Sequence, residues 1–358
     1  MVGKVRFLND FLRGSWPWIL RKFWLITLVL STSVILSPQT VTITAHTVSG
    51  GPAGITTGPD GALWFTENAG NKIGRMTTNG MFTEYEVPTP SSGVDSISVG
   101  PDGALWFTEH QRNNIGRITP NGAFTEYVIL TAASGPAGIT TGPDGALWFT
   151  ESVASKIGRI STDGAITEYT IPTLNAGPRH ITTGLDGALW FTENAGNNIG
   201  RVSTSGMFTE YAIPTSGAGA VDITTGPDGA LWFTEFGLYA NKIGRITSLG
   251  VITEYSVPSS GAGPLHITSG ADGALWFTEF LANKIGMLAT TGAFTEYALP
   301  ESDRGPAGIT NGPDHIVWFT EYYSNDIARA VLRERAGCKT LVEFSKSPGL
   351  RSPCQPRI

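Results

Sequence analysis

Apolar and polar residues alternate along most of this chain in short runs separated by turn residues. The first such set lies between residues 53 and 87 and reads AGITT, ALWFTE, KIGRM and FTEYEV. Runs of this length with a period of two predict β-strands, and the Gly, Asn and Asp between them favour tight turns. Because the repeating part has no convincing 3.6-residue period, we expect an all-β domain.

This set of runs occurs in seven consecutive copies. Trp-Phe-Thr-Glu recurs in steps of 42 residues, with one step of 44, at Trp64, Trp106, Trp148, Trp190, Trp232, Trp276 and Trp318. Four antiparallel strands repeated with this period are typical of a β-propeller rather than a solenoid. We predict a seven-bladed β-propeller of four-stranded antiparallel blades over residues 41–332, with the Trp and Phe side chains packed between neighbouring blades.

The seventh copy lacks a good fourth strand, and two segments are candidates to replace it. VTITAHTV, residues 41–48, precedes the first copy and alternates like a strand. Its pairing with the seventh copy would close the ring and leave no open sheet edge. CKTLVEF, residues 338–344, is the competing candidate.

The two ends of the chain differ from the repeats. In residues 1–37, basic residues precede a short apolar run, as in a secretion signal or an uncleaved signal-anchor. Either interpretation predicts export to the periplasm or outside the cell, with membrane contact only through this segment. Residues 333–358 form a tail in which Cys338 and Cys354 either form a disulfide or remain free thiols.

Composition narrows the class of partner. The 45 glycines and 15% charged residues suit many short strands and turns. A net charge of −6, with no basic run inside the repeats, argues against nucleic acid. We therefore expect a monomer that binds a small molecule or a peptide at one mouth of the central channel.

Function in a ring of similar blades is expected where the copies differ. Just before the AGITT run, copies one, three and seven read Pro-Ala-Gly, whereas the other four carry polar substitutions. These place five side chains near one channel mouth: Asp95, Arg179, His180, Asp222 and His266. A histidine beside a carboxylate and an arginine suits acid–base chemistry, and polar substitution at a solvated surface is the competing interpretation.

Two further features concern the same mouth. The glutamate ending each second strand should return there, because the strand runs antiparallel to the first. Pairing with the arginine of KIGR or with turn amides is the alternative for these glutamates. Copies five to seven replace small polar turn residues with larger ones, among them Tyr239, Phe280 and Tyr322. They suggest a ligand surface, with packing between adjacent loops as the alternative.

The tandem phrases DGALWFTE, NKIGRIT and ITEYTIP resemble those of the streptogramin B lyases, also called virginiamycin B lyases, over residues 41–332. The resemblance implies a Mg²⁺-dependent lyase that opens a cyclic depsipeptide antibiotic by elimination at its ester, using a histidine base. On this basis His266 and Glu321 are the candidate catalytic residues, and Glu279 and Glu321 the candidate Mg²⁺ ligands. The candidate substrate contacts are Arg179, His180, Asp222, Asp95, Tyr239 and Tyr322.

The chain departs from the family pattern at the residues that the family uses for catalysis. The family's sixth repeat begins Pro-His-Ala-Ile, whereas residues 264–267 read Pro-Leu-His-Ile, which would turn the histidine to the other face of a regular strand. Its seventh begins Glu-Pro-His-Gly, where residues 305–308 read Gly-Pro-Ala-Gly. Three functions therefore remain: an exported lyase, a non-catalytic cell-surface or periplasmic binding propeller, and a lactonase-type metal propeller using Asp95 and Asp222.

Overall fold

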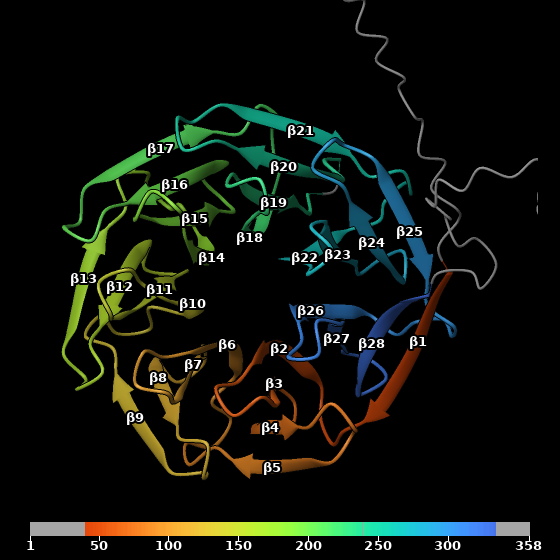
Figure 1. Cartoon of the computed structure of the whole chain (residues 1–358). Helices are drawn as coiled ribbons and strands as arrows, with labels where there is room; N and C mark the ends of the chain where they lie inside the picture. Colours follow the sequence, from red (N-terminus) through yellow and green to blue (C-terminus); the bar gives the residue numbers. More distant parts are fainter. Residues whose placement is uncertain (1–39, 238, 334–358) are drawn as a thin grey trace, which may run out of the picture. The chain divides into compact units, whose positions relative to one another are not determined.

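The computed structural model, which describes residues 40–237 and 239–333, is a ring of seven four-stranded antiparallel sheets around a central channel (Figure 1). This confirms the predicted seven-bladed β-propeller. The innermost strands are β2 (Pro52–Thr57), β6 (Val94–Val99), β10 (Pro136–Thr141), β14 (Pro178–Thr183), β18 (Ala220–Thr225), β22 (Pro264–Ser269) and β26 (Pro306–Asn311). The second strands are β3 (Leu63–Glu67), β7 (Leu105–Glu109), β11 (Leu147–Glu151), β15 (Leu189–Glu193), β19 (Leu231–Glu235), β23 (Leu275–Glu279) and β27 (Val317–Glu321).

The outer half of each blade follows the same order. The third strands are β4 (Lys72–Met76), β8 (Asn114–Ile118), β12 (Lys156–Ile160), β16 (Asn198–Val202), β20 (Lys242–Ile246), β24 (Lys284–Leu288) and β28 (Asp326–Arg333). The outermost strands are β5 (Phe82–Glu86), β9 (Phe124–Val128), β13 (Ile166–Thr170), β17 (Phe208–Ala212), β21 (Ile252–Ser256), β25 (Phe294–Ala298) and β1 (Thr40–Thr47). No helix in the described part of the chain is long and apolar enough to cross a membrane.

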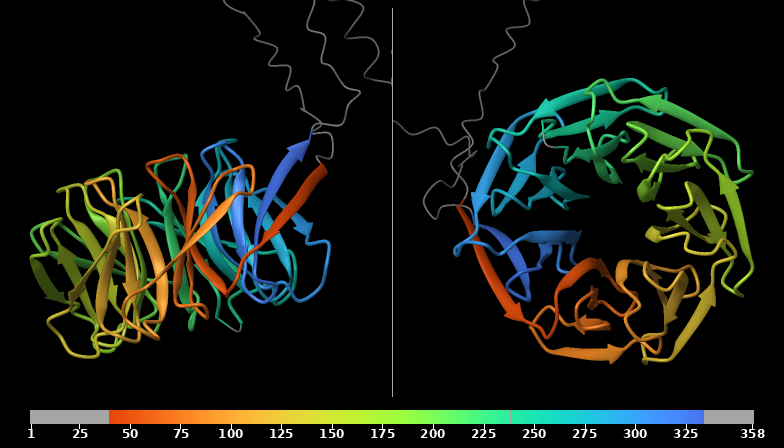
Figure 2. Two further views of the ribbon diagram at one scale, coloured as in Figure 1. Left: turned by 90° about the horizontal axis from the view of Figure 1, so that it is seen from below. Right: turned by 180° about the vertical axis from the view of Figure 1, so that it is seen from behind.

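The ring is closed by the segment before the first repeat. β1 pairs antiparallel with β28, so that the seventh blade has the order β1-β28-β27-β26 (Figure 2). The apolar side chains of Val41 and Ile43 pack against the interface between blades six and seven. The N-terminal candidate for the closing strand is therefore confirmed. Residues 338–344, the leader at 1–37 and both cysteines lie outside the described residues.

Apolar packing between neighbouring blades forms the core. Trp64 of blade one is fully buried against Leu105, Phe107 and Ile118 of blade two. The glycine of KIGR serves the same packing, since a Cβ at Gly74 would lie 2.1 Å from the ring of Phe65. Equivalent clusters join the other blades, and each buried aromatic removes roughly 150–250 Å² from water.

The arginine of KIGR does not pair with the repeated glutamate, and that expectation was wrong. In blade one, Arg75 Nε donates to Asp60 Oδ2 at 2.6 Å, and Trp64 Nε1 donates to Asp60 Oδ1 at 3.0 Å. The reason is register. Arg75 lies opposite Trp64 across the β3–β4 pair, whereas Glu67 lies opposite Lys72 at the other end of the blade.

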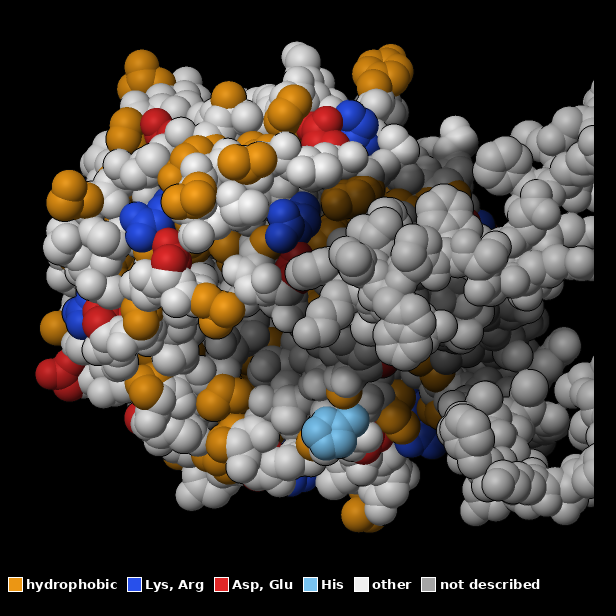
Figure 3. All heavy atoms as spheres, turned by 45° about the horizontal axis from the view of Figure 1, so that its top comes forward, with side chains coloured by type: hydrophobic (Ala, Val, Ile, Leu, Met, Phe, Trp, Pro, Cys, Tyr) orange, Lys and Arg blue, Asp and Glu red, His pale blue; other side chains and the backbone are white. Residues whose placement is uncertain are grey.

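Charged side chains on the outside of the ring are mostly paired. Lys72 Nζ lies 2.7 Å from Glu84, and Lys156, Lys242 and Lys284 make the same pair in their own blades. In the face shown in Figure 3, basic and acidic side chains lie side by side among scattered apolar residues. Opposite charges in neighbouring positions keep the outer surface of this face from forming a single-sign field.

Removing β1 tests how far the ring depends on its closing strand. We expect a chain lacking residues 1–48 to unfold on the order of 10 °C below one lacking only residues 1–37, because β28 becomes an open edge and the cover over blades six and seven is lost. Thermal unfolding followed by circular dichroism measures the difference, and gel filtration reports edge-to-edge association. Equal midpoints would show that β1 contributes little to closure.

Candidate functional site at one mouth of the channel

A threonine from each blade fixes the first strand of the next. Thr192 Oγ1 of blade four accepts from the His180 amide at 3.2 Å and donates to the carbonyl of Val221 in blade five at 2.8 Å. The same fully buried threonine, the Thr of Trp-Phe-Thr-Glu, makes this double contact around the ring. The residue after each carbonyl that a threonine binds, such as Asp222 after Val221, therefore occupies the same position in every blade.

An irregularity in each first strand directs these residues. The β22–β23 register shifts between Pro264 and Ile267, and corresponding shifts occur in the other blades. In a regular strand Leu265 and His266 would face opposite sides, but here both line the channel mouth. The one-residue displacement of His266 relative to the family pattern therefore does not turn it away from the channel.

Three side chains in consecutive blades converge on the channel. His180 Nδ1 lies 3.2 Å from Asp222 Oδ1, and His266 Nδ1 lies 3.2 Å from Asp222 Oδ2. The two imidazole ring centroids are 4.7 Å apart. Asp222 also accepts main-chain hydrogen bonds from Ile223 at 2.8 Å and from Ile267 at 2.9 Å. Each carboxylate oxygen of Asp222 thus faces one imidazole nitrogen and accepts from one amide.

The charges in this cluster support one another. Burial alone would favour the neutral form of Asp222, but His180 and His266 outweigh it and hold the pKa of Asp222 below its usual range. Burial also opposes a charge on His180, yet the facing carboxylate of Asp222 raises the pKa of that imidazole. The arrangement therefore favours an ionised Asp222 between the two rings, and it favours the protonated form of His180 more than water does.

The cluster opens into a hollow at the channel mouth. His180 and His266 share its wall with Asp95, Phe280 and Tyr322, and its volume is about 580 Å³ including the part open to solvent. The enclosed part, about 220 Å³, is smaller than a usual small-molecule site of roughly 300–1,000 Å³, so a larger ligand would extend into the open mouth. Deeper in the channel the lining includes Asp222 and polar threonines.

The structure brings together some of the predicted residues and separates others. Asp95, His180, Asp222, His266 and Tyr322 line the mouth or the channel. In their own blades, Asp95 and Arg179 lie one residue before the position that His180, Asp222 and His266 occupy. The reason is that the buried threonines bind the carbonyls of Asp95 and Arg179. Arg179 is exposed, and its side chain does not line the hollow.

The larger turn residues divide in the same way. Phe280 and Tyr322 wall the hollow, but Tyr239 is 92% exposed and is not part of that wall. Sequence reasoning missed Ser96, Leu265 and Ala307, which also line the mouth. Ser96 and Leu265 are next in sequence to the predicted residues Asp95 and His266, which was the available signal. Only the strand irregularity shows that both residues of such a pair reach the wall of the hollow.

Glu279 and Glu321 lie at the expected end of their strands but not in the channel. Glu279 pairs with Pro264 across the β22–β23 ladder, yet its side chain is fully buried, and Glu321 is buried beside Arg304 with an Nη1–Oε2 distance of 2.7 Å. Strand alternation explains this, because the glutamate shares the face of the Phe two residues before it and points between blades. Their placement at the open mouth was wrong.

The residues present do not fit a Mg²⁺ site of the kind the resemblance implied. Mg²⁺ prefers oxygen ligands that leave room for several waters, whereas Glu279 and Glu321 are enclosed by protein. Within the described residues, the His/Cys/Asp/Glu group with metal-ligand spacing is His180, Asp222 and His266, which offers two imidazole nitrogens and one carboxylate. That donor set suits transition metals better than Mg²⁺.

The repeated glutamates give the protein a pH-dependent stability. Burial, reinforced by the carboxylate of Glu254, raises the pKa of Glu235 to about 8, and burial raises the pKa of Glu109 and Glu151 to about 7. The folded protein keeps protons that the unfolded chain releases above its ordinary carboxyl pKa of 4.5. The resulting stability is fully present below that pH and is lost as the pH rises toward 8.

Replacing Glu235 by Gln tests this dependence. We expect the free energy of unfolding of the wild type to fall between pH 5 and 8, and the Glu235→Gln slope to be shallower by up to about 1 kcal/mol per pH unit. The Gln side chain keeps the volume and has no proton to lose. Urea unfolding at several pH values measures the slopes. Identical slopes in the two proteins would mean that Glu235 does not carry a raised pKa.

Comparison with known proteins agrees with this fold. The virginiamycin B lyase family model matches residues 39–267 and 255–337. A solved streptogramin B lyase is 43% identical, with a TM-score of 0.79, covering 82% of this chain and 98% of its own. A catalytically inactive histidine-to-alanine variant of virginiamycin B lyase from Staphylococcus aureus with quinupristin is also 43% identical, with a TM-score of 0.78 and coverage of 82% and 100%.

A more distant structure shares the fold alone. The extracellular domain of a putative hybrid two-component system from B. thetaiotaomicron is 16% identical, with a TM-score of 0.62, over 79% of this chain and 40% of its own. The family model and the 43% identical structures each cover most of the chain. The chain therefore belongs to the virginiamycin B lyase family.

Proposed function

We propose that this protein is a carbon–oxygen lyase that opens a cyclic depsipeptide, or a related ester, held at the channel mouth. The observation that carries the proposal is the cluster in which Asp222 holds His180 and His266 beside a hollow that opens at the channel mouth. Family membership supports the reaction class, and the hydrogen-bonded histidines support acid–base chemistry.

His266 is suited to the role of base. In the neutral ring, the tautomer that donates Nδ1–H to Asp222 carries its lone pair on Nε2, which can then accept a proton. Elimination transfers a proton from the carbon next to the ester-bearing carbon to His266. The alkyl carbon–oxygen bond of the ester then breaks, a carbon–carbon double bond forms, and the acyloxy group leaves as a carboxylate.

His180 is suited to stabilise the leaving group. Asp222 raises the pKa of this imidazole, which favours its protonated form, and its ring centroid lies 4.7 Å from that of His266. A cation there stabilises the negative charge that develops on the departing oxygen. One buried carboxylate thereby orients both rings, and no step depends on Mg²⁺.

The walls of the hollow support a peptide-like substrate. Phe280, Leu265 and Tyr322 offer apolar and aromatic contact, and Asp95 adds a carboxylate at the rim. A peptide or depsipeptide ring with apolar side chains matches such a surface better than a highly charged ligand does. The leader predicted at residues 1–37 favours action outside the cytoplasm, which signal-peptide mapping on the expressed protein would test.

A non-catalytic binding propeller is the second candidate. Ala307 lines the hollow in the seventh blade, where the family pattern has a histidine, and it offers no titratable group. A site that kept its walls but lost that group would bind without reacting. The two functions differ in a single observable, the appearance of product.

Incubation with quinupristin distinguishes them. We expect the wild type to give a linearised product by mass spectrometry, and His266→Ala to lose ~10²–10⁴-fold in rate because the base is gone. Leu249→Ala, at an 87% exposed turn position outside the hollow, should retain full activity. Binding by calorimetry without product would establish the binding function instead, and undiminished activity in His266→Ala would exclude His266 as the base.

A further inference from the structure

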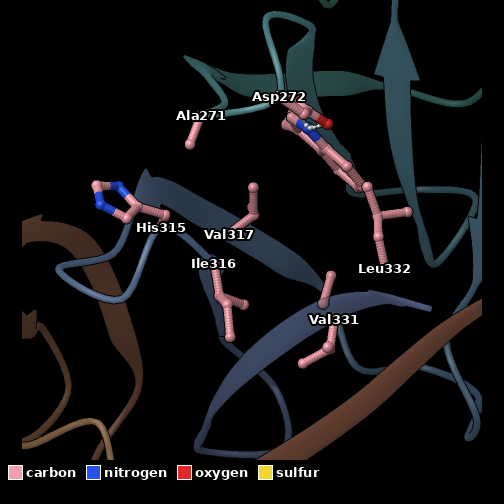
Figure 4. Close-up of a pocket in the computed structure, with 9 residues that line it drawn as sticks. Ala271, Asp272, His315, Ile316, Val317, Val331 and Leu332 are labelled. Carbon is pink, nitrogen blue, oxygen red and sulfur yellow. Dashed lines mark hydrogen bonds between the residues drawn. The ribbon is translucent and has the colours of Figure 1, made fainter. Parts of the chain in front are cut away.

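A second hollow lies between blades six and seven, away from the channel mouth. It is lined by Asp272 and Trp276 of blade six and by His315, Val317 and Leu332 of blade seven. Figure 4 labels Asp272 and the three residues of blade seven. Its volume is about 440 Å³ including the part open to solvent, and it shares no lining residue with the mouth. The proposed function does not use it.

The other blades show which group normally binds to the aspartate and tryptophan at this position. In blade five, Arg245 Nε lies 2.7 Å from Asp228 Oδ2, Trp232 Nε1 donates to Asp228 Oδ1 at 2.9 Å, and the guanidinium carbon is 5.8 Å from the Trp232 ring centroid. The Arg–Asp pair occurs in five blades, at Arg75, Arg117, Arg159, Arg201 and Arg245. The chain thus supplies its own examples of a guanidinium bound to this carboxylate.

Blade six lacks that guanidinium. Met287 lies opposite Trp276, where five other blades place the paired arginine. Within the described residues, Asp272 accepts only from Trp276 Nε1, at 3.0 and 3.2 Å, and from the Ala274 amide at 3.1 Å. Its carboxylate is therefore hydrogen-bonded to neutral donors without a partner of opposite charge.

A second observation at the same interface is an unsatisfied hydroxyl. The Tyr297 ring stacks on Trp276 at a centroid distance of 5.8 Å, and its buried hydroxyl has no hydrogen-bond partner among the described residues. The corresponding tyrosines of the other blades do not share this defect in the described structure. Burial and the neighbouring carboxylate of Asp272 raise the pKa of Tyr297. A buried polar atom without a partner costs free energy, so the packing around Trp276 is less completely satisfied than in the other blades.

Blade seven supplies the space. Ala330 lies where the other blades have a fully buried large apolar residue, namely Met76, Ile118, Ile160, Val202, Ile246 or Leu288. These side chains pack toward the tryptophan of the preceding blade, as Ile118 does toward Trp64. The smaller Ala330 leaves an opening beside Trp276, bounded by Val317, Val331 and Leu332.

We propose that this hollow binds a guanidinium group carried on a short apolar chain, such as an arginine side chain of a peptide or an alkylguanidine. The guanidinium pairs with Asp272 and lies near the Trp276 ring, restoring the contacts that an arginine of the chain makes in five other blades. The apolar chain lies against Leu332 and Val331. A planar, always charged group with five donors suits this position better than a compact, strongly hydrated ammonium.

The indole N–H of Trp276 is a direct reporter, because it donates to Asp272. We expect n-butylguanidine, added to the full ¹⁵N-labelled chain, to shift that indole signal saturably, while the neutral isostere n-butylurea leaves it unchanged. Asp272→Asn identifies the signal among the tryptophan indoles. A blocked arginine tested beside a blocked citrulline distinguishes a peptide source from a free small molecule.

Two variants with precedents in the same chain make the test specific. Met287→Arg reproduces the other blades and should fold normally, yet weaken binding at least about tenfold because its own guanidinium occupies Asp272. Arg245→Met frees Asp228 without creating a hollow, since Leu288 fills the equivalent space, and should gain no comparable binding. Three results would each overturn the proposal. The first is no saturable shift in the wild type, and the second is equal affinity of the wild type and Met287→Arg for n-butylguanidine. The third is binding at Asp228 in Arg245→Met as tight as binding at Asp272 in the wild type.

Discussion

The structure depends on the burial of one tryptophan per blade against the next blade. A four-stranded blade is apolar on both faces, so it gains stability only when neighbours cover it, and a closed ring is the arrangement that covers every face. Trp64 and its six counterparts are almost completely buried in these interfaces, each anchored by its indole N–H to an aspartate of the PDG-type turn. The ring leaves its channel and its rims free to vary.

The same packing sets the geometry of the candidate site. In each blade a buried threonine accepts from a first-strand amide of its own blade and donates to a first-strand carbonyl of the next, which places His180, Asp222 and His266 in equivalent positions of consecutive blades. Three residues more than 40 positions apart in sequence therefore meet around one carboxylate. Because Asp222 is held by two amides and two imidazoles, its charge is balanced by close donors rather than exposed to solvent.

Both proposed sites lie where a blade departs from the repeat, and the repeat itself explains why. A residue that most or all copies share serves what the interfaces need: the glutamates are buried between blades, and five of the arginines are paired with aspartates. Where a copy changes, as at His266, Met287 or Ala330, a group or a space becomes available to a ligand. Internal copies act as matched controls that a protein without repeats does not offer.

The sequence by itself determined the number of blades, the four strands of each and the segments that differ, because strand alternation and turn residues are local properties with a fixed period. It also offered β1 as a closing strand, although only the structure decided between that segment and its rival. Tertiary structure alone determined side-chain direction. An irregular first strand turns both Leu265 and His266 toward the mouth, while regular alternation buries Glu279 and Glu321 between blades. Whether the arginine of KIGR meets the glutamate or the aspartate depends on cross-strand register, which is fixed only when the whole blade pairs.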